Sequence, residues 1–215
     1  MFRQTLPDPA EALPGRDTPI DPGGAHAVSG RPMLPPFPGG MKEVRLGMGC
    51  FWGAERLFWQ LSGVWVTAVG YAGGLTPHPT YEEVCTGRTG HAEVVRVVYN
   101  PDEITLLQLL KSFWENHDPT SGMRQGNDIG TQYRSCILVD DETDLALACE
   151  TRDTYQEVLT RAGRGHITTA IALDPVFYFA EPYHQQYLHK HPDGYCGLRF
   201  NGVSCPLPAG SAHQR

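Results

Sequence analysis

The spacing of apolar and polar residues along the chain predicts an alternation of strands and helices. Strands are expected where apolar residues alternate or run together, over residues 43–48, 64–71, 91–99, 133–139 and 167–173. Helices are expected where apolar residues recur every three or four positions, over residues 54–61, 81–85, 105–117, about 142–161 and shortly after 182. Thr105 and Gln108 have the spacing of a capping box, which places the start of the third helix.

The order of these elements over residues 43–139 is β-α-β-β-α-β, the split βαβ arrangement of ferredoxin-like folds. The predicted fold class is therefore α+β, with a ferredoxin-like core, a mixed sheet, helices on one main face, extra helices and long coil segments. We assign this domain to residues 41–190.

The two ends of the chain lack such a pattern. Residues 1–40 contain half of the 18 prolines and no sustained apolar period, so we expect an extended arm without a core of its own. Residues 191–215 are expected to be a mobile tail, and its glycine-rich part, GYCGLRFNGVSCP, carries Cys196 and Cys205.

Composition narrows the possible partners and the location. The formal net charge of -7 and the absence of a basic run disfavour binding to nucleic acid. No stretch approaches the roughly 18 apolar residues of a membrane span, and the N-terminal sequence lacks the apolar core of a signal peptide. We expect a cytoplasmic protein, free of the membrane and monomeric. The six cysteines are then unlikely to form a static disulfide framework, because cytoplasmic thiols are kept reduced.

One cysteine has an unusual setting, in the stretch GCFWG at residues 49–53. By residue type alone, Cys50 is more often a small buried hydrophobe. Its position between a strand and a helix favours a nucleophile, since the amide groups at a helix start stabilise a thiolate. Phe51 and Trp52 either line a small apolar pocket or pack in the core.

The chemistry of such a cysteine stays open on these residues alone. A soft thiolate beside an apolar pocket suits a sulfur electrophile, and equally the acyl carbon of a cysteine hydrolase or acyl transferase. Several histidines are available as a base by type, namely His91, His117, His166 and His184. Cys196 and Cys205 add the thiols needed for a disulfide relay. A zinc site or a redox-responsive binding module is the non-enzymatic alternative.

A longer set of motifs resembles peptide methionine sulfoxide reductase A, in its three-cysteine, enterobacterial form. The similarity runs from about Leu13 to Leu207 through GCFWGAERLF, GYAGG, PTYEEVC, TGHAEVVRVVY, FWENHDPT, QGNDIGTQYRS, HQQYLHK and GYCG. The resemblance implies a single α+β domain that reduces the S epimer of methionine sulfoxide, free or in proteins. It implies repair of oxidised methionine with thioredoxin as reductant, without a metal or an organic cofactor.

The resemblance also implies roles for individual residues of this sequence. Cys50 matches the nucleophile that attacks the sulfoxide sulfur, and Glu93 matches the acid that protonates the oxygen. The groups expected around the oxygen and the ε-methyl are Tyr81, Tyr133, Asp128, Phe51, Trp52 and Tyr195. Cys196 would attack the sulfenic acid left on Cys50, and Cys205 would then form a disulfide with Cys196 near the surface.

Overall fold

A computed structural model describes residues 3–206 of the chain, and its centre is one six-stranded sheet. The sheet order is β7-β6-β1-β3-β2-β8. These strands are β1 (Lys42–Met48), β2 (Val64–Ala72), β3 (Ala92–Tyr99), β6 (Ser135–Val139), β7 (Ala170–Leu173) and β8 (Tyr178–Phe179). β7 is parallel to β6, and every other neighbouring pair is antiparallel, so the sheet is mixed as predicted.

The four central strands and two helices form the predicted ferredoxin-like core. α1 (Phe51–Trp59) connects β1 to β2, and α3 (Leu106–Glu115) connects β3 to β6. β3 therefore lies between β1 and β2, and β1 lies between β3 and β6, which is the split βαβ pairing. The capping box of α3 is present, since the Thr105 hydroxyl accepts from Gln108 N and the Gln108 side chain accepts from Thr105 N.

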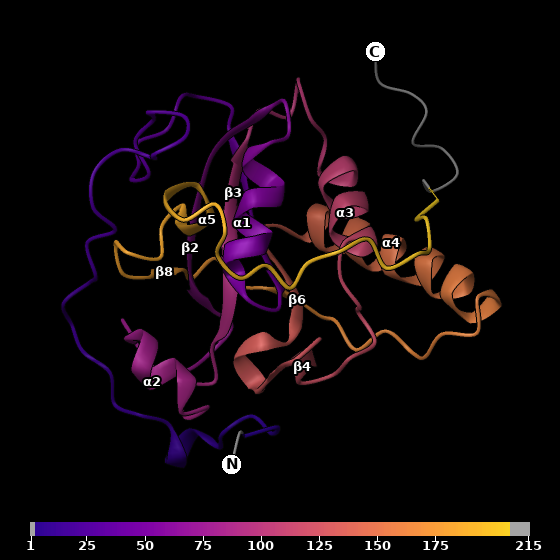
Figure 1. Ribbon diagram of the computed structural model, residues 1–215, viewed down its shortest axis with the longest axis horizontal. Coiled ribbons are helices and arrows are strands. Elements are labelled where there is room, and N and C mark those ends of the chain that lie inside the picture. Colours follow the sequence, from indigo (N-terminus) through magenta and orange to yellow (C-terminus); the bar gives the residue numbers. More distant parts are fainter. Residues whose placement is uncertain (1–2, 207–215) are drawn as a thin grey trace.

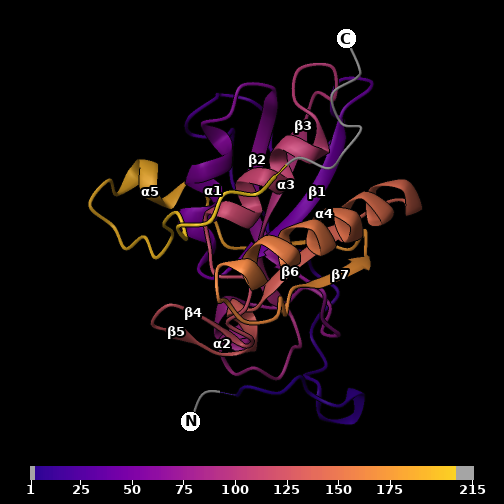
Figure 2. The ribbon, with the colours of Figure 1, turned by 90° about the vertical axis from the view of Figure 1, so that its right-hand side faces the viewer.

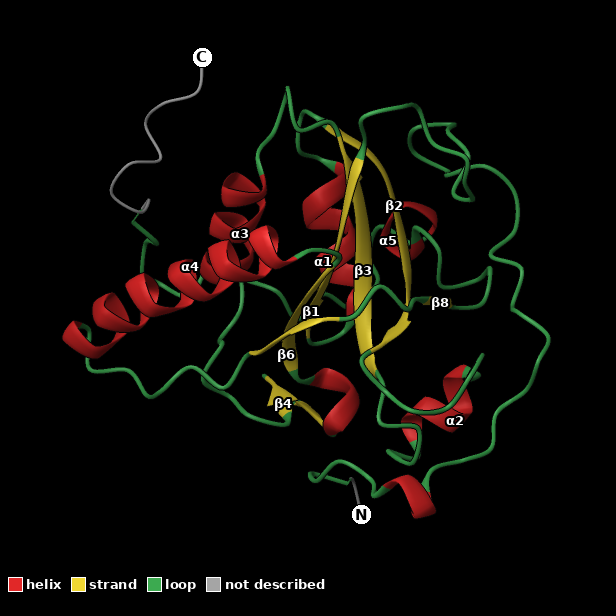
Figure 3. Ribbon diagram, turned by 180° about the vertical axis from the view of Figure 1, so that it is seen from behind, coloured by secondary structure: helices red, strands yellow, loops and turns green. Residues whose placement is uncertain are grey.

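The helices gather on one face of the sheet, as the sequence predicts. α1 lies in front of the strands in Figure 1 and behind them in Figure 3, and α3 and α4 (Glu142–Arg161) lie to one side, next to β6. Their apolar side chains meet those of β1, β3 and β6 in the main core, which includes Phe58, Phe113 and Trp114. The shorter helices are α2 (Tyr81–Cys85), α5 (Tyr187–Lys190) and the 3₁₀ helix η1 (Pro9–Glu11).

The second face of the sheet is covered by chain without regular structure. Met33 of the N-terminal arm packs with Val66, Ala68 and Val98 there, together with Phe177 and Phe179. β3 is consequently buried along its whole length, although its alternating sequence is typical of a strand with one exposed face. The arm is ordered against the domain in this way from Arg3 onward.

Several element boundaries differ from the sequence prediction for local reasons. α1 begins at Phe51 rather than Ala54, because Cys50 is already the cap residue of the helix. β6 begins at Ser135, since Thr131–Tyr133 form a 3₁₀ turn (η2) before it. The loop between α3 and β6 holds a small hairpin, β4 (Arg124–Gln125) with β5 (Asp128–Ile129), which its apolar pattern did not indicate.

The tail crosses the helical face rather than leaving it. Residues 191–206 are mostly coil that passes over α1 toward α3 and α4 (Figure 1), and Cys205 is buried in the main core. The rest of the predicted mobile tail, residues 207–215, lies outside the described residues. Among residues 3–206, no helix is both long and apolar enough to cross a membrane.

Candidate active site

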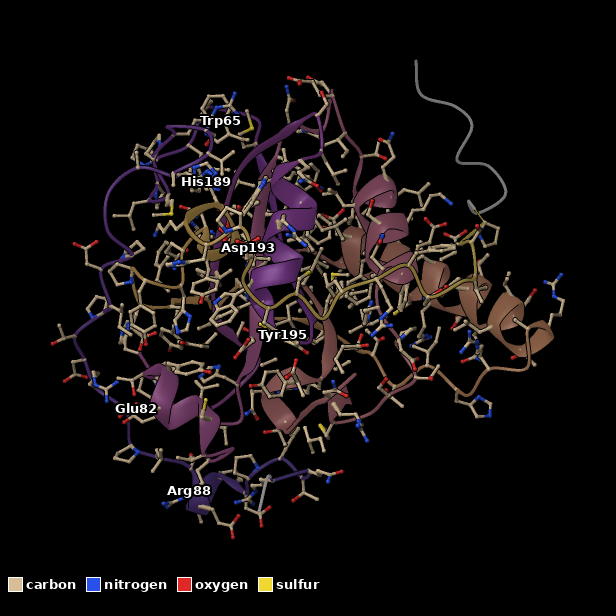
Figure 4. The ribbon with its side chains drawn as sticks, viewed as in Figure 1. Trp65, Glu82, Arg88, His189, Asp193 and Tyr195 are labelled. Atoms are coloured by element: carbon tan, nitrogen blue, oxygen red, sulfur yellow. The ribbon has the colours of Figure 1, made fainter. Side chains whose placement is uncertain are left out.

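A pocket of about 150 Å³ opens at the start of α1, and eight residues line it. They come from five segments far apart in the sequence: Cys50, Phe51, Trp52, Tyr81, Glu93, Asp128, Tyr133 and Tyr195. Each of the eight was expected at the site from the resemblance. Tyr195 of the tail lies over this pocket, near the centre of Figure 4.

Cys50 is held at the junction of β1 and α1. Gly49 has a φ of +91°, and a Cβ there would lie 2.6 Å from the side chain of Gln125, so only glycine suits this turn. The Trp52 N–H at the helix start lowers the pKa of Cys50, in the direction predicted. Burial and the neighbouring Glu93 outweigh it and raise the pKa of Cys50 well above its usual value. Burial therefore opposes the thiolate that the helix start favours.

Glu93 projects from β3 into the bottom of the pocket. It is almost fully buried, and one of its carboxyl oxygens accepts a hydrogen bond from Phe51 N at 3.0 Å. Burial raises the pKa of Glu93 to about 8, with a smaller contribution from Asp128, while the Phe51 N–H acts to lower it. At neutral pH Glu93 is mostly protonated, so it can act as a proton donor inside the pocket.

Two phenol groups line the pocket beside this carboxyl group. Tyr81 is the first residue of α2, whose start is fixed by a capping box between Thr80 and Glu83. Its backbone N–H donates to Glu181 at 2.8 Å. Tyr133 ends the 3₁₀ turn η2. Burial raises the pKa of both phenols, so both keep their protons and can donate hydrogen bonds to an oxygen.

Asp128 and Tyr195 form the outer rim of the pocket. The Tyr195 hydroxyl donates to Asp128 at 3.1 Å, which links the tail to the β4–β5 hairpin. Burial raises the pKa of Asp128, and the hydrogen bond from Tyr195 acts against that shift. The carboxylate lies close enough to Glu93 to raise its pKa as well.

Two residues that the sequence analysis did not assign to the site contact the aromatic residues of the pocket wall. Trp52 Nε1 donates to His184 Nδ1 at 3.0 Å, and Tyr187 stacks on the Trp52 ring at 3.8 Å between centroids. His184 also contacts the rings of Phe51 and Tyr81. Burial lowers the pKa of His184 to about 4, so the ring is neutral and serves as an acceptor. The motif HQQYLHK contains both residues, but only the fold shows their contact with Trp52.

A buried network behind α1 holds this wall in place. Glu55 is fully buried and accepts hydrogen bonds of 2.7 Å from both the backbone and the side chain of Gln186. The Gln186 side-chain oxygen accepts from Ala27 N of the arm at 3.0 Å. Because Tyr187 follows Gln186 directly, the arm and α1 together position the residue that stacks on Trp52.

The two tail cysteines have different surroundings. Cys196 lies against α1, since a Cβ on Gly53 would be 2.9 Å from its sulfur. Cys205 packs in the main core, and its backbone N–H donates to Glu115 at 2.8 Å. Burial raises the pKa of Cys205 to about 11, so it is a neutral thiol in this arrangement. All six cysteines are free.

The pocket favours a small, polarisable group that carries an oxygen. A thiol faces it from one side, a protonated carboxyl group and two phenols can donate protons or hydrogen bonds, and the aromatic wall can hold a methyl group. Within residues 3–206, no group of three or more His, Cys, Asp and Glu side chains is arranged to hold a metal ion. The fold and the site thus define a thiol enzyme with its own proton donor.

Comparisons with known proteins identify which thiol enzyme this is. The family model described as peptide methionine sulfoxide reductase matches residues 42–206. The peptide methionine sulfoxide reductase MsrA of Rhodospirillum centenum is 62% identical, over 98% of this chain and 96% of that protein. The chain belongs to the peptide methionine sulfoxide reductase family and is an oxidoreductase that reduces methionine sulfoxide.

Solved structures agree with this assignment. The structure of methionine sulfoxide reductase A of Corynebacterium diphtheriae has a TM-score of 0.85 and 46% identity, covering 95% of this chain and 99% of that one. It confirms the α+β fold class. The structure of Mxr1 from Saccharomyces cerevisiae in complex with Trx2 has a TM-score of 0.51 and 25% identity, covering 78% and 95% of the two chains.

Proposed function

We propose that this enzyme reduces the S epimer of methionine sulfoxide, free or in proteins, through a relay of Cys50, Cys196 and Cys205 that thioredoxin regenerates. The observation that carries the proposal is the meeting of the Cys50 thiol, the protonated Glu93 and the two phenols around one small pocket. The chemistry that follows uses only side chains and needs no cofactor.

In the first step, Cys50 attacks the sulfoxide sulfur as Glu93 gives its proton to the oxygen. Sulfoxide oxygen is a poor leaving group unless it is protonated, which makes a neutral carboxyl group near pH 7 useful. The phenols of Tyr81 and Tyr133 hydrogen-bond the oxygen as it gains negative charge. The Cys50 thiol proton returns to Glu93, and the bond between the two sulfurs breaks as the oxygen moves to Cys50. The products are a sulfenic acid on Cys50 and methionine, which has gained two electrons from the thiol.

The orientation of the substrate follows from the two sides of the pocket. The ε-methyl group packs on Phe51 and Trp52, whose rings are held by His184 and Tyr187. The oxygen then faces the polar side with Glu93. Since sulfoxide sulfur is a stereocentre, fixing its methyl group and its oxygen leaves one direction for the side chain, which favours one epimer.

In the second step, Cys196 attacks the sulfenic acid, and water leaves as a Cys50–Cys196 disulfide forms. Its place against α1, one turn from Cys50, supports this role. Cys205 next attacks Cys196 and frees Cys50. This exchange requires the tail to leave its place in the core, because Cys205 is buried there.

The reductant in this proposal is thioredoxin, acting on the Cys196–Cys205 disulfide. Mxr1, which shares the fold, is known in a complex with Trx2. We expect the enzyme to work as a monomer, since the eight residues of the pocket all come from one chain.

The test is to incubate the pure protein with each sulfoxide epimer and dithiothreitol, then to map its disulfides by mass spectrometry. The S epimer should be reduced, and Cys50→Ser should abolish the reaction because no other thiol lines the pocket among the described residues. Full activity of Cys50→Ser would refute the mechanism. A cysteine hydrolase, the alternative from sequence, would turn over fully without Cys196 and Cys205.

A further inference from the structure

A second and larger cavity, of about 440 Å³, lies beside the tail and has no part in the chemistry above. Its walls are the loop after α3, the end of α4 with the loop that follows, and tail residues between Cys196 and Cys205. Figure 2 looks at this end of the molecule, where β4, β5, α4 and the tail come together. We call this cavity the arginine groove, because Arg124, Arg164 and Arg199 line it.

The charge of the groove is opposite to that of the protein. Within residues 3–206, none of the three arginines forms an ion pair: Arg124 donates to Gly126 O, and Arg164 donates to Asn201 O. The one acidic residue in the wall, Asp118, accepts from the backbone and the hydroxyl of Thr120. The chain as a whole has a formal net charge of -7, so this local excess of positive charge is notable.

The arginine groove continues from the catalytic pocket along two shared segments. The β4–β5 hairpin supplies Gln125 to the groove and Asp128 to the pocket, and the tail supplies Gly197 to the groove and Tyr195 to the pocket. A peptide with its sulfoxide in the pocket can therefore place neighbouring residues over the groove by following either shared segment.

We propose that the arginine groove binds acidic side chains of the polypeptide that carries the methionine sulfoxide. The inference rests on the proposed function and adds a sequence preference to it. The catalytic pocket has room for little more than one side chain, so the neighbouring residues of a substrate must lie on the surface around it. Arginine is suited to carboxylates there, because its planar donors match both oxygens.

The state of the tail favours the substrate over the reductant as the occupant. All walls of the groove are present in this structure, in which every cysteine is reduced. The reduced enzyme is the form that accepts a sulfoxide. Thioredoxin acts later, on a Cys196–Cys205 disulfide. Forming that bond moves the residues between the two cysteines, which make one wall of the groove.

The experiment compares short peptides that hold a central methionine sulfoxide between aspartates, serines or lysines, with dithiothreitol as reductant. The wild-type kcat/KM should be about three- to tenfold higher for the aspartate peptide than for the serine peptide at low salt, the size expected for a few exposed charge pairs. The preference should shrink at about 0.5 M NaCl, where the screening length falls to a few ångströms.

Two double variants locate the effect. Arg124→Gln with Arg164→Gln should remove the preference and leave reduction of free methionine sulfoxide unchanged, because the free amino acid does not reach the groove. Arg124→Lys with Arg164→Lys keeps the charge and should keep most of the preference. Arg88→Gln is the matched control, at a distant part of the surface (Figure 4).

Each other outcome has a defined meaning. Equal rates for the aspartate and serine peptides, or a preference that survives Arg124→Gln with Arg164→Gln, would overturn the inference while the proposed function stands. A variant could instead keep the peptide preference and lose turnover with thioredoxin but not with dithiothreitol. That result would assign the groove to the reductant and would also overturn the inference. Failure of the wild-type enzyme to reduce free methionine S-sulfoxide would overturn the proposed function instead.

Discussion

Replacing Glu93 by glutamine separates the catalytic role of its proton from the role of its shape. Glutamine has nearly the same volume, and its amide oxygen can still accept the hydrogen bond from Phe51 N, which is 3.0 Å long in the native protein. The variant loses only the transferable proton. Since a positioned general acid contributes about 10²- to 10⁴-fold, we expect single-turnover formation of methionine to slow by about 10²- to 10³-fold.

The same substitution should stabilise the protein at neutral pH. The pKa of Glu93 is raised from 4.5 to about 8, chiefly by burial, so the folded state binds this proton more tightly than the unfolded state. Its contribution to stability is complete below pH 4.5 and is lost as the pH rises to about 8. Between pH 4.5 and pH 7, about 2.5 pH units, stability falls by about 1.4 kcal/mol per unit, or about 3.5 kcal/mol in all. Glutamine has no proton to lose and avoids this cost.

The assay is urea unfolding of both proteins at pH 5 and pH 7, together with single-turnover kinetics. We expect Glu93→Gln to gain about 2 to 3 kcal/mol relative to the native protein at pH 7, and less than about 1 kcal/mol at pH 5. Glu55, whose pKa burial raises to about 7, is present in both proteins and cancels in the comparison. Glu103→Gln, at an exposed site, is the control and should change neither quantity. A stability difference that is the same at both pH values, or an unchanged rate, would refute the reasoning.

Three further substitutions test the surroundings of the pocket. Gln186→Ala leaves the buried Glu55 with fewer partners, so urea unfolding should show a loss of about 2 to 3 kcal/mol, and a loss below about 0.5 would contradict the network. His184→Phe keeps the ring but removes the acceptor of Trp52 Nε1, so steady-state kinetics should show KM raised by about three- to tenfold at similar kcat. Cys205→Ser should still form methionine in a single turnover but recycle slowly with thioredoxin; unchanged steady-state turnover would show that Cys205 is not the last thiol.

Much of the fold could be predicted from the sequence because its central elements repeat apolar residues with a clear period. The strands β1 and β3 and the helix α3 belong to this class, and their capping and alternation agree with the structure. The β4–β5 hairpin was missed, since its two strands have two residues each and lie among glycines and polar groups. Period-based reasoning has no signal for such short pairings.

The site was predicted by resemblance more than by residue type. Glu93 alone reads as a solvated charge on an alternating strand, whereas its side chain shares the helical face of β3 with Val95 and Val97 and is covered by the start of α1. The stacking of Tyr187 on Trp52 and the grouping of Arg124, Arg164 and Arg199 depend on segments far apart in the chain. No local pattern encodes those contacts, so they required the three-dimensional structure.

The structure shows that the helix start is not the main influence on the ionisation of the Cys50 thiol. The amide groups there favour a thiolate, yet burial and a charged Glu93 together oppose it more strongly. The two groups are coupled, because the ionised form of Glu93 raises the pKa of Cys50. A protonated Glu93 therefore serves twice: it removes the charge that opposes ionisation of the thiol, and it holds the proton that the sulfoxide oxygen needs. One protonation state of Glu93 therefore favours both the nucleophile and the acid.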